Sequence, residues 1–170
     1  MRRLFQILFI FNVFSTSAQN YTSLYLTTGL NRIGVAYEVG GSYSFQAHNV
    51  QFGFRFYEPD LVFEKDFPGI NIGYFYALRR DKKMQLNLGA QLSGFYESKG
   101  STKLWLIDPK LTCGTAWNLN YKWTLNLTSG VGTVVNFVET SYKIEQNTFV
   151  YLNYELSLGI TYRLGSITNN

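Results

Sequence analysis

The sequence INIGYFYALRR, residues 70–80, followed by DKK and MQLNLGAQLSGFYE, residues 81–97, decides the fold of this chain. In both halves apolar residues occupy every second position, as Leu86 and Leu88 do on either side of Asn87. Successive side chains of a strand point to opposite faces, so this period predicts two β-strands, each with one apolar and one polar face. The short charged segment between them predicts an antiparallel hairpin.

The same alternation recurs along the chain and predicts eight strands. We expect them at residues 21–30, 32–46, 49–58, 70–78, 84–97, 105–119, 121–137 and 150–164. Connections after the second, fourth and sixth strands are short, whereas longer ones are expected at 58–69, 98–103 and 139–147. An even number of antiparallel strands with alternating short and long connections predicts an up-and-down transmembrane β-barrel of the outer-membrane type. The short turns would then face the periplasm.

Alternation alone does not separate a membrane barrel from a secreted, lipocalin-like lipid binder, because the two have opposite faces outside. Charged residues make up only 15% of the chain and aromatic residues 18%. The polar face is mostly Gly, Ser, Thr, Asn and Gln, whereas the surface of a soluble barrel would be rich in Lys and Glu. The apolar face carries more bulk than an eight-stranded interior can hold. The sequence therefore favours lipid contact, with interface aromatics expected at Trp105, Trp117, Tyr121, Trp123 and Tyr162.

The closing strand, YLNYELSLGITYRL at 151–164, has alternating apolar residues and ends near an aromatic residue. With the strand pattern over 21–164, the chain resembles the small eight-stranded outer-membrane β-barrel proteins of bacteria, of a Bacteroidota-like type. It departs from them at the end of this strand, where residues 165–170 follow and the usual terminal Phe is absent. The resemblance implies insertion by the barrel-assembly machinery, contact with outer-membrane lipid and a non-enzymatic envelope role, with secretion or conjugal-transfer machinery as options.

The first eighteen residues predict an export signal. Arg2 and Arg3 precede a short apolar core at 4–14, and the small residues 16–18 suit cleavage before Gln19. The barrel domain would then comprise residues 19–170. The formal net charge of +4 is small and dispersed, so a nucleic-acid partner is not expected.

Several ionisable residues fall on the polar, inward parity, where unpaired charges would be costly. We predict a buried charge network that plugs the lumen, and the residues assigned to it are Glu38, Arg55, Lys110, Glu155 and Arg163. Lys122 shares the inward parity. A selective pore or proton path is the alternative reading.

Two details of register support this network. A four-residue turn at 46–49 would pair Phe45 with Val50 and place Glu38 diagonally from Arg55. Gly130 and Gly132 would leave space in which Lys110 and Glu155 could approach each other.

Catalytic or metal chemistry is not expected. Lipid-modifying enzymes on this scaffold need a histidine with a nucleophile, and the only histidine, His48, lies in a predicted turn. The single cysteine, Cys113, fits a small apolar strand residue better than a nucleophile. No metal or cofactor site is predicted, because the acids at 60–66 match no calcium-loop spacing.

Two connections are candidates for binding partners. The predicted loop 58–69 carries exposed apolar residues that could dock an envelope protein or fold over the barrel mouth: Leu61, Val62, Phe63 and Phe67. The basic turn with Arg79, Arg80, Lys82 and Lys83 is expected to be a solvated end, with an anionic periplasmic partner as the alternative. A small channel or ligand-binding barrel remains the alternative to the non-enzymatic membrane protein.

Overall fold

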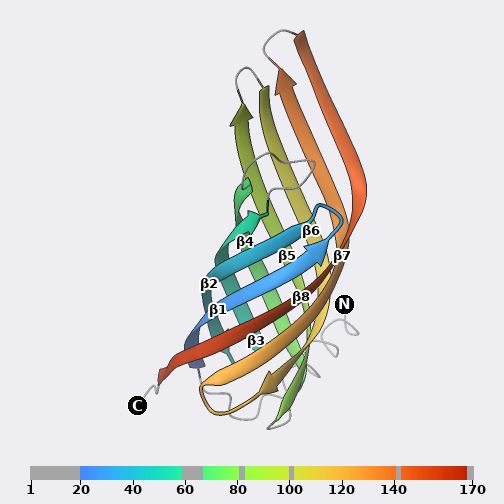
Figure 1. Ribbon diagram of the computed structural model, residues 1–170. Helices are drawn as coiled ribbons and strands as arrows, with labels where there is room; N and C mark the ends of the chain where they lie inside the picture. Colours follow the sequence, from blue (N-terminus) through green and yellow to red (C-terminus); the bar gives the residue numbers. More distant parts are fainter. Residues whose placement is uncertain (1–19, 59–66, 81–82, 100–101, 141–142, 168–170) are drawn as a thin grey trace, which may run out of the picture.

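The computed structural model describes residues 20–58, 67–80, 83–99, 102–140 and 143–167. Eight antiparallel strands close into a single barrel in chain order, with β8 pairing back on β1 (Figure 1). They are β1 (Asn20–Asn31), β2 (Val35–Phe45), β3 (His48–Tyr57), β4 (Phe67–Arg80), β5 (Met84–Lys99), β6 (Thr102–Asn118), β7 (Trp123–Thr140) and β8 (Lys143–Ile167). Within these residues, no helix is long and apolar enough to cross a membrane.

The two ends of the barrel differ in their connections. Residues 46–47, 81–83 and 119–122 connect strands at one end, called the turn end, where Asn20 also pairs with Ile167. The opposite end, called the loop end, carries the connections 32–34, 58–66, 100–101 and 141–142. The proposed signal peptide at 1–18 lies outside the described residues.

The predicted alternation of faces is present, with polar residues inside and apolar residues outside. On β6, for example, Leu111 is 70% exposed whereas its neighbour Lys110 is 3% exposed. Large apolar side chains line the outer face of every strand. This arrangement is the reverse of a lipocalin-like barrel, in which the apolar face encloses the ligand cavity.

The strands are unequal, and this corrects two predicted loops. β5 to β8 run far beyond the neighbouring strands at the loop end, so they rise as a four-stranded extension (Figure 1). Register pairs reach Lys99↔Thr102 and Thr140↔Lys143, so the long loops predicted at 98–103 and 139–147 are wrong. Two paired strands satisfy each other's backbone groups in an extended hairpin, so a polar sequence can remain strand there.

A third predicted loop is also shorter than expected. Phe67 is the first residue of β4 and pairs with Tyr57, so 67–69 is strand and not loop. Leu61, Val62 and Phe63 lie outside the described residues.

The β2–β3 turn sets the register of the interior. Phe45 pairs with His48, which leaves only Gln46 and Ala47 in the turn, and Gln46 adopts a φ of 50°. The predicted pairing of Phe45 with Val50 is therefore wrong by two residues. The tighter turn places Glu38 directly opposite Arg55.

Candidate functional site

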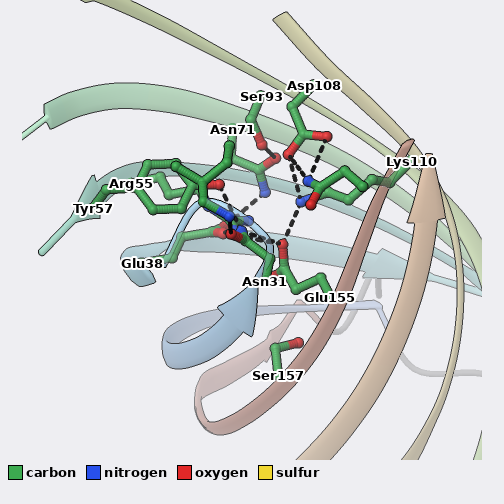
Figure 2. A network of polar contacts seen from close by, with 12 residues as sticks. Asn31, Glu38, Arg55, Tyr57, Asn71, Ser93, Asp108, Lys110, Glu155 and Ser157 are labelled. Atoms are coloured by element: carbon green, nitrogen blue, oxygen red, sulfur yellow. Dashed lines mark hydrogen bonds and ion pairs between the residues drawn. The ribbon is translucent and has the colours of Figure 1, made fainter. Parts of the chain in front are cut away.

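Polar side chains from every strand except β7 meet inside the barrel (Figure 2). All of them sit on the inward parity of their strands, and none of the charged ones is more than 7% exposed. The charged members are Glu38 on β2, Arg55 on β3, Asp108 and Lys110 on β6, and Glu155 on β8. These five residues are called the charge network below.

The charges of the network alternate in a chain. Arg55 Nη1 lies 3.5 Å from Glu38 Oε2, and Arg55 Nη2 donates to Glu155 Oε2 at 2.5 Å. Lys110 Nζ also donates to Glu155 Oε2 and lies 3.0 Å from Asp108 Oδ2. Acids and bases therefore alternate from Glu38 to Asp108, with a carboxylate at each end and Glu155 at the centre.

Neutral groups satisfy the two terminal carboxylates. Glu38 Oε1 accepts from the Tyr25 hydroxyl at 2.6 Å and from Asn71 Nδ2 at 2.8 Å. Asn71 is oriented in turn by Ser93 Oγ, which donates to its Oδ1 at 2.9 Å. At the other end, Asn153 Nδ2 lies 3.1 Å from both oxygens of Asp108. Buried charges are tolerated when their remaining lone pairs are hydrogen-bonded in this way.

Glycines provide the space that the long side chains need. A Cβ on Gly132 would lie 2.8 Å from both Cα and Cγ of Lys110, its partner across the β6–β7 pair. A Cβ on Gly40 would lie 2.7 Å from the Tyr25 hydroxyl, which reaches past this position to Glu38. A side chain at Gly132 would displace Lys110, and one at Gly40 would displace Tyr25.

An apolar layer lies on the loop-end side of the network. It consists of buried residues contributed by the β1–β2 connection and five strands: Ile33, Ala36, Tyr57, Phe95, Leu106 and Val134. The Tyr57 ring lies 4.9 Å from the Phe95 ring and 5.5 Å from the Arg55 guanidinium. Asn31 links the layers, because its Nδ2 donates to the Tyr57 hydroxyl at 2.7 Å and lies 3.5 Å from Glu155 Oε2. Apolar and ionic layers are therefore stacked across the interior.

A cavity lies on the turn-end side of the network. Its volume is about 100 Å³, and Glu38 and Glu155 are among its lining residues. Its wall is mostly hydroxyl and amide side chains, and Lys122 and Arg163 line it at the turn end. A polar cavity of this size has room for several water molecules.

The chain is similar to solved structures in its fold alone. The designed barrel TMB2.3, known from a solution structure, is 11% identical and matches with a TM-score of 0.56 over 88% of this chain and 98% of its own. A second structure, from de novo design of transmembrane β-barrels, is 13% identical with a TM-score of 0.50 over 87% of this chain and 98% of its own. The chain has the fold of a transmembrane β-barrel.

A natural protein is among the structural matches as well. Neisserial surface protein A is 16% identical, with a TM-score of 0.48 over 85% of this chain and 96% of its own. No protein-family model and no curated protein matches the sequence.

The structure brings together four of the five residues predicted for the lumen network: Glu38, Arg55, Lys110 and Glu155. Arg163 is separate, because its guanidinium lies 4.0 Å from the Tyr21 ring near the turn end. Asp108 was missed, although it shares the inward parity of Lys110 and alternation alone could have revealed it. The alternation pattern does not single out the neutral partners Tyr25, Asn71 and Asn153, because many other neutral polar residues lie on the same inward face.

The predicted interface aromatics lie at both ends of the outer wall. Near the loop end, Trp105 is half exposed and its ring lies 4.3 Å from that of Tyr96. Near the turn end are Trp117, Tyr121, Trp123 and Tyr162, and the rings of Trp123 and Tyr162 are 4.6 Å apart. His48 is also at the turn end, where its Nδ1 lies 2.6 Å from the Tyr74 hydroxyl. Among the described residues, no three His, Cys, Asp or Glu side chains are grouped to hold a metal ion.

Proposed function

We propose that the chain is a non-enzymatic, integral outer-membrane β-barrel protein whose lumen is plugged. It acts through its extracellular loops or as an envelope or assembly component, with secretion or conjugal-transfer machinery among the candidates. The observation that carries this proposal is an ion-paired polar interior inside a wall whose outer face is apolar. Such a wall suits lipid, because every strand edge is paired in a closed barrel.

Plugging of the lumen is supported by the two stacked layers. An ion crossing the barrel would have to displace Arg55 and Lys110 from Glu155 and then pass the apolar layer. Breaking a buried ion pair costs about 3–5 kcal/mol. The absence of catalysis is supported by the position of His48, which bonds Tyr74 on the outer face and lies away from the charge network.

Contact with partners is assigned to the loop end. The apolar residues Leu61, Val62, Phe63 and Phe67 remain the proposed docking surface for an envelope protein, and outer-membrane lipid covers the wall. Export through a cleaved signal peptide and insertion by the barrel-assembly machinery complete the proposal.

Two measurements test the proposal. Membrane fractionation should place the protein with the outer membrane, and unheated samples should migrate differently from boiled ones on a gel. Purified protein in a planar bilayer should give no stable conductance. A freely soluble protein would instead support a secreted lipid binder, and regular conductance steps would contradict plugging.

The cavity at the turn end favours a second candidate, a small channel or ligand-binding barrel. Its hydroxyl and amide lining could bind a small polar solute entering from that side. The conductance measurement separates a channel from a cavity that is closed at the charge network.

A further inference from the structure

Several cationic residues lie at the turn end, where backbone hydrogen bonds join their turns to neighbouring strands. The amide of Asn118 donates to the Lys83 carbonyl at 2.9 Å, which joins the β4–β5 turn to the end of β6. The Arg163 amide donates to the Lys122 carbonyl at 2.8 Å, which joins the β6–β7 turn to β8. Lys83 and Lys122, whose side chains are exposed, are called the basic rim below, whereas Arg163 lines the cavity beside them. Arg79, Arg80 and Lys82 adjoin Lys83 in the sequence.

The β6–β7 turn holds Lys122 in a defined place. Asn120 Oδ1 accepts from the amides of Lys122 at 2.8 Å and Trp123 at 2.9 Å, so this side chain fixes the turn. The Lys122 ammonium is fully exposed and lies 5.5 Å from the Tyr121 ring and 5.8 Å from the Tyr162 ring. A lysine ammonium is charged at neutral pH, and a hydrogen bond with Tyr162 raises its pKa further.

The rings around Lys122 are of the kind that gather at a membrane–water interface. Tyr121 is 75% exposed, and Trp123 pairs with Tyr162 on the outer wall. Tyr and Trp rings are enriched at the membrane–water interface because each has an apolar body and a polar tip. Although Lys122 contributes to the cavity wall, its ammonium lies beside the Tyr121 and Tyr162 rings.

The charge at the other end of the barrel is mixed. There Lys103 Nζ lies 3.5 Å from Glu139 Oε2, and Glu58 and Glu97 add further acids. At the turn end, by contrast, the described parts of the connections and strand ends contain no Asp or Glu. In the sequence, Asp81 is the one acid in the turn-end connections, whereas Arg79, Arg80, Lys82, Lys83 and Lys122 lie in or beside them, so the net charge of this end is positive.

We propose that the basic rim, with Tyr121, Trp123 and Tyr162, is a binding surface for anionic phospholipid headgroups in the leaflet at the turn end. The proposal rests on the membrane insertion proposed above. A headgroup phosphate beside Lys122 is complementary in charge, while the adjacent rings contact glycerol and the upper acyl chains. Each surface cation contributes about 1 kcal/mol toward an anionic leaflet, which is about fivefold in affinity.

The experiment compares reconstituted protein in vesicles of phosphatidylcholine with protein in vesicles that also contain phosphatidylglycerol. A band shift between unheated and boiled samples first reports whether the barrel has inserted. Native mass spectrometry then counts the phosphatidylglycerol that each variant retains. The variants are Lys122→Gln, the double change Lys83→Gln with Lys122→Gln, and the control Lys103→Gln at the loop end.

The unmodified barrel should retain phosphatidylglycerol in preference to phosphatidylcholine. Lys122→Gln should lower that retention about fivefold and the double change further, whereas Lys103→Gln should leave it unchanged. High salt should weaken retention, because the cations are exposed.

The possible failures differ from one another. A protein that inserts into neither vesicle contradicts the proposed function and this inference together. Insertion with equal retention by Lys122→Gln and Lys103→Gln overturns the lipid site alone. If inorganic phosphate displaces phosphatidylglycerol at similar concentration, the rim binds free phosphate and the proposal is overturned as well.

Discussion

Arg55 Nη2 donates to Glu155 Oε2 at 2.5 Å, although the two residues are 100 positions apart in the sequence. Closure of the barrel produces this contact, since β8 returns to β1 beside the β2–β3 hairpin. Glu155 also accepts from Lys110, so one carboxylate holds both buried cations. The network contains three carboxylates and two cations. Glu155 contacts both cations, so its loss should destabilise the barrel most.

Glu155→Gln should destabilise the barrel more than any other single neutralisation in the network. It leaves Arg55 and Lys110 buried around a neutral amide, and breaking such a pair costs about 3–5 kcal/mol. The free energy of unfolding can be measured by urea titration of the protein refolded into lipid vesicles. A loss below about 1 kcal/mol, the size of one ordinary hydrogen bond, would contradict the central role of Glu155.

Glu38→Gln should cost less than Glu155→Gln, because Glu38 ends the chain and contacts only one cation. The amide oxygen of Gln can still accept from Tyr25 and Asn71. Glu38→Ala removes these bonds too and should lower thermal stability clearly, which the temperature of the gel band shift reports. An unchanged temperature for Glu38→Ala would rule out a stabilising network at this position.

Gly132→Ala should destabilise the barrel by about 1–3 kcal/mol, the usual cost of overpacking. The new Cβ would overlap the Pro109 carbonyl oxygen and lie 2.8 Å from Lys110 Cα, so the β6 backbone must shift and Lys110 moves with it. Gly94→Ala is the matched control, because a Cβ there meets no atom within 4 Å. If Gly132→Ala and Gly94→Ala lower the free energy of unfolding equally in the same titration, the loss would come from replacing any strand glycine and not from the contact with Lys110.

Cys113 offers a direct test of which face touches lipid. It is the single cysteine of the chain, and it is exposed on the outer wall of β6. In vesicles it should be protected from a charged maleimide, because lipid excludes the reagent and disfavours the reactive thiolate, and it should react after unfolding. Rapid labelling of the inserted barrel by the charged reagent would place this face in water.

The intact barrel should be electrically silent, and removing large side chains from both stacked layers should open it. Combining Arg55→Ala and Glu155→Ala with Tyr57→Ala removes central network members and a large residue of the apolar layer. We expect conductance steps in planar bilayers for this variant if it folds. The gel band shift checks folding, and Leu111→Ala on the outer wall is the control. A folded triple variant that stays silent would show that other side chains close the lumen.

The sequence by itself determined the number of strands, their approximate positions and the face that each side chain occupies. This information is local, because the period of two follows from the geometry of a single strand. It was enough to put Glu38, Arg55, Lys110 and Glu155 in the lumen, and Gly130 and Gly132 beside the last two. It was also enough to place Asp108 there, although that residue was overlooked.

Only the tertiary structure decided which of these residues touch. Register depends on turn geometry, and the two-residue turn at Gln46 and Ala47 moved Arg55 from a diagonal to a position opposite Glu38. Barrel closure then brought Glu155 to Arg55 and left Arg163 at the turn end. The long β7–β8 hairpin likewise depended on strand pairing, since a polar sequence becomes strand when a neighbour supplies its hydrogen bonds. Such contacts join residues far apart in the chain, and alternation within one strand carries no information about them.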